Sequence, residues 1–226
     1  MGRGSSKAQN KAGGGVGLSS IPNGRGGTIE LDSPLTYGEK DAALTGKERA
    51  TIEAWEDKRR KNKIEYALLL DENGDVVAEN KGGRGSVRST LYQLNQTKTF
   101  THNHPREQES LLGGTFSDSD LINFANNTKN TTKRATAKEG TYSITKTSGF
   151  DSTGFRSFVK ESTGANLKEY KDAVKQTASN YKNKSISLDD YYKANDKAFN
   201  NMLLKCHNDL LNNQKKYGYN YTLEAL

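Results

Sequence analysis

Two of the three histidines in this chain stand one residue apart, in the segment Thr-His-Asn-His-Pro at 101–105. Imidazole nitrogens are common ligands of zinc and other transition metals. Side chains two positions apart in an extended strand point to the same face, so His102 and His104 can reach one ion. The pair therefore predicts a metal site, although two solvated histidines in a loop would show the same spacing.

A carboxylate follows the histidines in the motif Ser117-x-x-Asp120. Ser117 is a favourable helix N-cap, and Asp118 and Asp120 fall in the first turn, where the helix dipole favours negative charge. The same residues would begin an ordinary helix in any protein. With Asp120 as a third ligand, one position on the ion stays open, as in catalytic rather than structural zinc sites. We therefore expect Zn²⁺ at His102, His104 and Asp120.

Glu65 leads into the apolar run Tyr-Ala-Leu-Leu-Leu at 66–70. Such a run is typical of a central strand that is covered on both faces. A carboxylate beside a buried strand needs a partner or a function, because burying an unpaired charge is costly. Next to a metal ion, Glu65 would be the acid/base that moves a proton from water to the leaving group. The alternative is an ordinary surface acid at the end of a strand.

Together, these motifs resemble the JAB/MPN (JAMM) metallopeptidase family, and in particular its RadC-like bacterial members. The family signature is a glutamate on an early strand, then His-x-His, then Ser-x-x-Asp at the start of a helix. The likeness covers roughly residues 45–148. It implies an α+β fold, in which a curled, mixed β-sheet is flanked by helices.

This resemblance implies that the protein is a zinc-dependent hydrolase of peptide or isopeptide bonds. His102, His104 and Asp120 would bind the ion, Glu65 would be the acid/base, and Ser117 would donate a hydrogen bond to the developing oxyanion. Zinc lowers the pKa of its bound water to about 7, so that hydroxide is available near neutrality.

The loop between the second histidine and the serine departs from the family pattern. It holds twelve residues, Pro105 to Phe116, which is longer than usual in the family, and it contains Gly113-Gly114. A basic, glycine-rich front and a Lys/Asn/Tyr-rich helical end also resemble, more loosely, proteins found beside phage head genes. The alternative function is therefore a phage-associated structural or interaction protein that uses this fold without catalysis.

Composition divides the chain into three parts. Residues 1–27 are rich in Gly, Ser and Asn and hold basic but no acidic side chains. They are predicted to be a flexible tail, because they offer too little apolar surface to offset the entropy of ordering. Residues 28–150 contain the motifs and form the expected JAB/MPN-like domain. Residues 151–226 are expected to be a helical extension made of two amphipathic helices. His207, in the second helix, is expected to be an ordinary helical histidine, because no other metal ligand stands at a suitable spacing from it.

Turn and cap signals predict the elements of the central domain. Thr45-x-x-Glu48 predicts a capping box at a helix start, and Asn73-Gly74 between apolar runs predicts a hairpin. Ile52 and Trp55 of that helix are expected to face the core. The other expected elements are an extended segment at 28–37, a turn at 82–86, a short helix at 87–96, strands at 97–102, 134–137 and 140–147, and a polar loop at 126–133.

The composition of the whole chain limits the classes of protein. The single cysteine cannot form an intramolecular disulfide, so we expect a reducing compartment, the cytoplasm, or the virion for a phage-encoded protein. No apolar run approaches the ~20 residues that span a bilayer, and no membrane association is expected. The expected partners are a protein or peptide substrate and a phage or bacterial protein that binds the C-terminal helices. The net charge of +7 leaves nucleic acid as an alternative partner, supported only by the basic ends of the chain.

Overall fold

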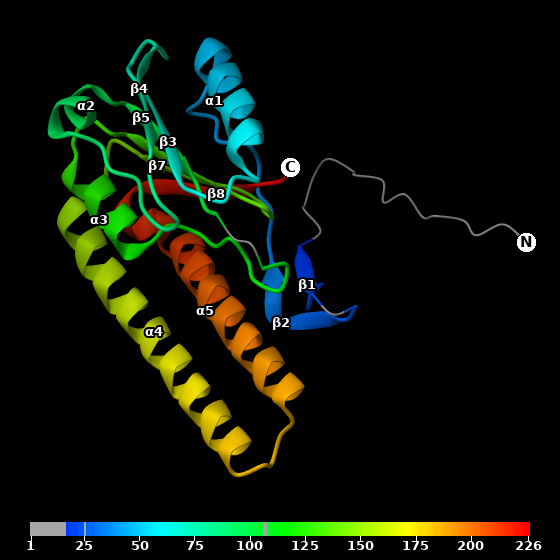
Figure 1. Ribbon diagram of the computed structural model, residues 1–226. Coiled ribbons are helices and arrows are strands. Elements are labelled where there is room, and N and C mark those ends of the chain that lie inside the picture. The colour runs from blue at the N-terminus through cyan, green and yellow to red at the C-terminus, as the bar shows by residue number, and fades with distance from the viewer. Residues whose placement is uncertain (1–16, 25, 106–107) are drawn as a thin grey trace, which may run out of the picture.

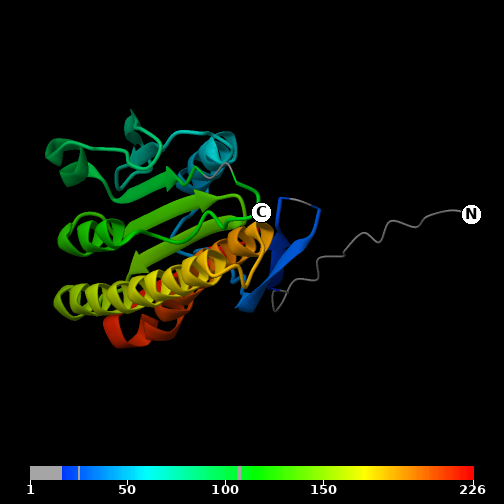
Figure 2. The same ribbon diagram turned by 60° about the horizontal axis from the view of Figure 1, so that its bottom comes forward.

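The computed structural model describes residues 17–24, 26–105 and 108–226 and shows an α+β fold. A six-stranded mixed sheet lies in the middle, with α1 on one face and the helical pair α4 and α5 on the other (Figures 1 and 2). In chain order the elements are β1 (Leu18–Pro22), β2 (Thr28–Leu35), α1 (Gly46–Arg59), β3 (Tyr66–Leu70), β4 (Val76–Lys81), α2 (Leu91–Gln96), β5 (Thr99–Asn103), α3 (Asp118–Asn126), β6 (Thr132–Ala137), β7 (Gly140–Lys146), α4 (Ser152–Lys182), α5 (Leu188–Tyr217) and β8 (Tyr219–Glu224). The predicted α+β fold, with a curled mixed sheet, flanking helices and a helical C-terminal region, is confirmed.

The strands of the main sheet follow the order β4-β3-β5-β6-β7-β8. Strands β5 and β6 are parallel, and the other neighbouring pairs of this sheet are antiparallel. In this register, His102 of β5 stands between Ala67 of β3 and Ala135 of β6. Small residues on both sides leave room for the imidazole ring in the middle of the sheet.

One face of the sheet is apolar and is covered by α3, α4 and α5. Ala135, Tyr142 and Ile144 point to this face and share a core with Phe124 of α3 and Phe155 of α4. Helices α4 and α5 form a long hairpin whose far end extends past the sheet (Figure 1). The near half of this hairpin is therefore part of the main core.

Strand β8 joins the segment at 151–226 to the main sheet. It pairs antiparallel with β7, and Tyr219, Tyr221 and Leu223 are buried. Gly218 ends α5 in the left-handed conformation, with φ of 70°, which glycine adopts without steric cost. The expectation of a helical extension therefore needs correction at its C-terminal end, because the alternating Tyr and Leu side chains of β8 complete the sheet.

Strand β1 lies within the segment that composition predicts to be a flexible tail. It pairs antiparallel with β2, and Ile21 is buried in the main core with Ile29 and Leu35 of β2. The partner strand supplies the hydrogen bonds and apolar cover that this segment lacks by itself, so residues 18–22 belong to the fold. Residues 1–16 of the predicted tail lie outside the described part of the chain.

On the face of the sheet beneath α1, strands β5 to β8 carry polar side chains that are buried, whereas Leu68 and Leu70 of β3 pack against Ile52 and Trp55 of the helix. Thr101 of β5 donates to the Glu56 carboxylate of α1 at 2.8 Å, and Arg134 of β6 binds both Glu56 and Glu224 at 2.8–3.0 Å. Although burial alone would lower the pKa of the Arg134 guanidinium, the two carboxylates raise it. A buried charge network thus connects α1, β6 and β8.

Glu48 of α1 belongs to the same polar layer and does not cap its helix. Thr45 is the N-cap, but its side chain makes no capping hydrogen bond. Glu48 instead accepts from Thr99 Oγ1 at 2.5 Å and from Lys98 Nζ at 3.0 Å. The predicted capping box is therefore wrong, because partners from β5 and the residue before it bind this carboxylate.

Two predicted boundaries in the central domain also differ from the structure. The helix expected at 87–96 begins only at Leu91. Strand β6 begins at Thr132, so that Lys133 lies inside the sheet and not in the polar loop expected at 126–133. By contrast, Ile52 and Trp55 of α1 do pack on the core, as predicted.

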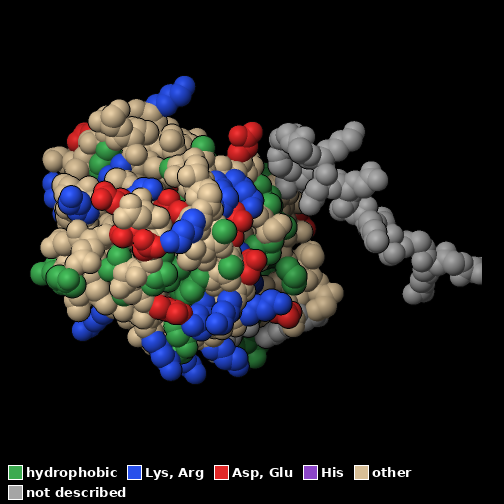
Figure 3. All heavy atoms as spheres, turned by 90° about the horizontal axis from the view of Figure 1, so that it is seen from above, with side chains coloured by type: hydrophobic (Ala, Val, Ile, Leu, Met, Phe, Trp, Pro, Cys, Tyr) green, Lys and Arg blue, Asp and Glu red, His purple; other side chains and the backbone are tan. Residues whose placement is uncertain are grey.

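Acidic and basic side chains are interspersed on the face of the molecule seen from above (Figure 3). Two ion pairs of α1 show the same mixture. Arg59 lies 2.5 Å from Glu79 of β4, and Glu53 lies 2.7 Å from Lys40. Several Lys and Arg side chains gather along the lower edge of this face, and over the rest of it the two charges lie close together.

Candidate metal centre

Strand β5 positions the two neighbouring histidines. His102 is buried in the middle of the sheet, and His104 lies one residue past the strand, where its backbone N–H donates to Thr136 O at 2.9 Å. The two Nε2 atoms are 2.9 Å apart. Facing imidazole nitrogens at this distance share either a proton or a cation, so the strand directs both rings to one point, as their spacing predicts.

The ring of His102 is held by packing. Its centroid lies 5.7 Å from that of Phe100 and 6.4 Å from that of Phe116. Its Nδ1 is buried and has no hydrogen-bond partner among the residues that the structure describes. Metal-binding histidines usually donate this second N–H to an acceptor, so His102 departs from the common arrangement.

Asp120 reaches the histidines from the first turn of α3. Its Oδ2 lies 3.5 Å from His102 Nε2, and the donor atoms of His102, His104 and Asp120 all lie within 4.8 Å of one another. A tetrahedral zinc ion, with ligand distances of about 2.0–2.1 Å, separates neighbouring donor atoms by about 3.3 Å. The separations of 2.9 Å and 3.5 Å suit such an ion, so this group could hold a metal ion.

The Asp120 carboxylate is held by Lys133 and Ser117. Lys133 Nζ lies 2.9 Å from Oδ1. Ser117 donates to Oδ2 from its hydroxyl at 2.7 Å and from its backbone at 3.1 Å, and the hydroxyl accepts from the Asp120 N–H at 3.1 Å. Ser117 is thus the N-cap of α3, as predicted, and it also positions the candidate ligand.

The charges around Asp120 keep its carboxyl ionised. Although burial alone would raise its pKa, Lys133 and His102 hold that pKa well below its ordinary value. Lys133 is itself buried, with Nζ 4.6 Å from the centroid of the Phe100 ring. An ionised carboxylate is the form that binds a metal ion.

The second ring nitrogen of His104 is held by the loop that follows. Nδ1 lies 2.9 Å from Gly114 O, so it must carry the proton and leave Nε2 as the ligand atom. The backbone N–H groups of Gly113 and Gly114 donate to the Glu139 carboxylate at 2.9 Å and 2.8 Å, and the Tyr142 hydroxyl donates to it at 2.8 Å. Glu139 therefore orients His104 through the backbone of this loop.

The two glycines of the loop allow this close approach. A Cβ atom on Gly113 would lie 2.5 Å from Ala137 Cβ, which is too close for any side chain. Gly114 has φ of +85°, a conformation that other residues adopt only with strain. The longer loop at 105–116 thus brings Gly114 O to the histidine while Glu139 satisfies its backbone donors.

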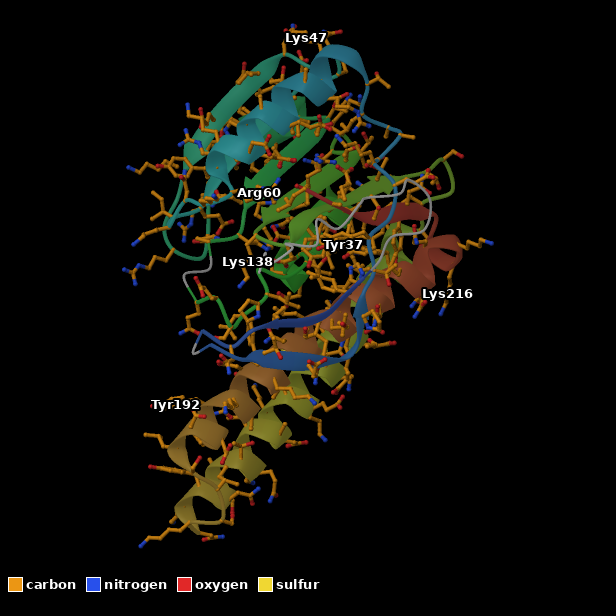
Figure 4. All side chains as sticks on the ribbon, turned by 90° about the vertical axis from the view of Figure 1, so that its right-hand side faces the viewer. Tyr37, Lys47, Arg60, Lys138, Tyr192 and Lys216 are labelled. Atoms are coloured by element: carbon orange, nitrogen blue, oxygen red, sulfur yellow. The ribbon has the colours of Figure 1, made fainter. Side chains whose placement is uncertain are left out.

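The turn that carries Glu139 is fixed from outside the loop. Arg60 Nη1 donates to Ala137 O at 2.7 Å, and the Tyr37 hydroxyl donates to Glu139 O at 2.9 Å. Lys138 Nζ donates to the backbone oxygen of Glu109 at 2.7 Å, so the turn is also joined to the loop that contains Gly113 and Gly114. Figure 4 shows Arg60, Tyr37 and Lys138 on the same side of the molecule, near the β6–β7 turn.

Asn103, between the two histidines, holds the backbone on both sides of Glu65. Its Oδ1 accepts from the Tyr66 N–H at 2.7 Å, and its Nδ2 donates to Ile64 O at 3.0 Å. Asn103 is fully buried, so these bonds are shielded from water. The strand that carries the histidines is thereby fixed to the residues that flank the candidate acid/base.

Glu65 is buried one residue before β3 and lines the same opening as His104, Ser117 and Asp120. His102 lines a second opening that also includes Glu65 and Asp120. The structure therefore brings together all five residues that the sequence predicts for the site.

Three residues of the site were not predicted, namely Lys133, Glu139 and Asn103. In β6, Thr132, Arg134 and Thr136 alternate with Lys133, Ala135 and Ala137. This period-two pattern is the sequence signal that places Lys133 on the same face of the sheet as Ala135. No local pattern indicates Glu139, because its partners lie 25 and 26 residues away in the sequence.

His207 lies in the core on α5 and not in this site. Its Nδ1 is 2.9 Å from the Tyr221 hydroxyl. Burial lowers the pKa of His207 to about 4, so the ring is neutral at neutral pH.

Comparisons of the chain with protein-family models, with curated proteins and with solved structures find no match. None of the helices in the described ranges is long and apolar enough to cross a membrane. A function is therefore inferred from the chemistry of the site.

Proposed function

We propose that the protein is a zinc-dependent hydrolase of peptide or isopeptide bonds. The observation that carries the proposal is the convergence of two imidazoles and an ionised carboxylate beside an opening that Glu65 also lines. Three protein ligands leave a coordination position for water or substrate, which is the arrangement of catalytic zinc. The resemblance of these residues to the JAB/MPN signature supports the same reaction.

The choice of zinc rests on the reaction as well as on the ligands. Two histidines and one carboxylate also bind Fe(II) in non-haem oxygenases, so the ligand types alone do not fix the metal. Hydrolysis needs a Lewis acid but no change of oxidation state, and zinc hydrolases use ligands of these types.

Each residue of the site would have its own role in hydrolysis. Zinc at this position would polarise the scissile carbonyl and lower the pKa of a bound water to about 7. Glu65 would accept the proton of the attacking water and return it to the leaving amine. Lys133 would keep Asp120 ionised. The Ser117 hydroxyl donates to Asp120 in this structure, so donation to the developing oxyanion would require it to turn away from that carboxylate.

The test is hydrolysis of a mixed peptide library and of isopeptide-linked substrates by the zinc-loaded full chain. Glu65→Gln removes the proton carrier with little change of shape, so it should keep the fold and the zinc while losing activity by about 10²–10⁴-fold. Glu72→Gln, at an exposed acid in the β3–β4 turn, is the matched control and should keep full activity. Equal activity of Glu65→Gln and wild type would refute the role of Glu65.

A zinc-loaded wild type that cleaves neither substrate class would refute the hydrolase proposal. That result would favour the phage-associated protein without catalysis. A nucleic-acid partner rests only on the basic ends of the chain, and its signature would be binding that weakens steeply with salt.

A further inference from the structure

An apolar groove begins at the candidate metal centre and continues between the two long helices. It is a cavity of about 330 Å³. At one end it is lined by Glu65, His104, Ser117 and Asp120. The walls farther from the centre, which define the apolar groove, include Phe158, Val159 and Leu167 of α4 and Phe199, Met202 and Leu203 of α5.

The helical walls of the apolar groove carry almost no charge. The ionisable residues that line the cavity are Glu65, Arg84, His104, Asp118, Asp120 and Cys206, and among them only Cys206 belongs to the two long helices. Burial raises the pKa of that thiol, so it is neutral and behaves as a small apolar group. The polar groups on these walls are the hydroxyls of Ser162 and Thr163, and Ser162 already donates to Asp209 at 2.5 Å.

We propose that the apolar groove binds a bulky apolar side chain, such as Leu, Met or Phe, next to the scissile bond of a peptide substrate. This inference rests on the proposed hydrolase function and names its substrate class. A carbonyl presented to the metal places the neighbouring side chain one residue, about 3.8 Å, along the chain. The candidate ligands His104 and Asp120 line the same cavity as the helical walls, so that side chain is presented to the groove. The unbranched Met202 side chain lets the wall adapt to side chains of different shape.

Other kinds of side chain fit the apolar groove poorly. A charged side chain would lose its hydration without gaining a partner, which is costly. A small side chain would leave the apolar walls in contact with water, so less free energy would be gained from burying apolar surface. The helical hairpin therefore gives the site a preference for bulky apolar side chains, which the three metal ligands cannot supply.

Binding can be measured without turnover by using the zinc-loaded Glu65→Gln full chain. The probes are pools of acetylated heptapeptides whose central residue is fixed as Leu, Phe, Met, Ala, Asp or Lys, with mixtures at the other positions. Pools with Leu, Phe or Met should bind at least about tenfold more tightly than the Ala pool, since a hydrophobic pocket discriminates on this scale.

A pair of leucine variants separates the apolar groove from the rest of the hairpin. Leu167 lines the groove and is 38% exposed, whereas Leu188 is 48% exposed and is not a lining residue. Leu188 lies close in sequence to Tyr192, in the half of the hairpin away from the sheet (Figure 4). Leu167→Glu should reduce binding of the apolar pools to the level of the Ala pool, and Leu188→Glu should not, with zinc content measured in both.

The outcomes separate this inference from the proposed function. Equal binding of all pools, tighter binding of the Asp or Lys pool, or equal effects of the two leucine variants would overturn the groove inference. Apolar preference in binding without any cleavage by wild type would support the groove and contradict the hydrolase. Cleavage by wild type without Leu, Met or Phe beside the cut would support the hydrolase and contradict the groove.

Discussion

The Nδ1 atom of His104 lies 2.9 Å from the carbonyl oxygen of Gly114. Because a carbonyl only accepts hydrogen bonds, this contact fixes the tautomer of the ring and directs the lone pair of Nε2 towards His102. The same loop donates two backbone hydrogen bonds to Glu139. A buried carboxylate in the β6–β7 turn thus determines the orientation of a candidate metal ligand.

Glu139→Gln should weaken zinc binding by about 10–100-fold, because residues that orient metal ligands contribute on this scale. The amide retains only one acceptor oxygen, whereas the carboxylate accepts from Gly113 and Gly114 with separate oxygens. Competition with a chelating dye measures the affinity. Glu109→Gln, an exposed acid in the same loop, is the control and should bind zinc as wild type does. Unchanged affinity in a folded Glu139→Gln protein would show that Glu139 does not position His104.

Asn103→Ala should lower the rate of hydrolysis by about 10–100-fold while one zinc ion per chain is retained. The reason is that Asn103 fixes the backbone beside Glu65, and a misplacement of about 1 Å costs up to this factor. Turnover and metal content are measured on the same sample. Asn212→Ala, at an exposed position of α5 away from the site, should change neither. Wild-type turnover by Asn103→Ala would contradict the positioning role.

Arg134→Met should lower the free energy of unfolding by about 3–5 kcal/mol, because it leaves the buried carboxylates of Glu56 and Glu224 without their cation. Urea denaturation measures the change. Arg88→Met removes an exposed arginine and should stay within about 0.5 kcal/mol of wild type. Similar stability of the two variants would mean that the buried network contributes little.

His207 should make the stability of the metal-free protein depend on pH between about 6.5 and 4. Burial lowers its pKa from 6.5 to about 4, so the unfolded chain binds the proton first as pH falls. The stability that this residue contributes is complete above pH 6.5 and is lost as pH falls towards 4, by up to about 3 kcal/mol. Urea denaturation at several pH values should show a shallower loss in His207→Gln. An identical loss in both proteins would contradict this cause.

The candidate site could be predicted from the sequence better than the buried polar layer between the sheet and α1. His102 and His104 are two residues apart in a strand and Ser117 caps a helix, so local rules were enough to bring these residues into one site. The alternating Thr residues of β5, β6 and β7 suggest instead a face exposed to solvent. They are buried because Glu48 and Glu56 of α1 bind that face, and local patterns do not reveal such partners.

Contacts between distant segments explain the other differences. Arg134 finds its carboxylates 78 and 90 residues away, and Glu139 finds the glycine loop 25 residues away. Strand β8 had a local signal, the alternation of Tyr219, Tyr221 and Leu223, but it follows directly after a long helix and was included in the helical segment.

The most direct test of the metal centre is the zinc content of the purified full chain by elemental analysis. The convergence of His102, His104 and Asp120 predicts one zinc ion per chain in the wild type and in Glu72→Gln. His104→Ala should contain almost none, because two remaining ligands bind zinc weakly. Wild-type protein that contains no zinc and takes up none on addition of the ion would contradict the metal centre.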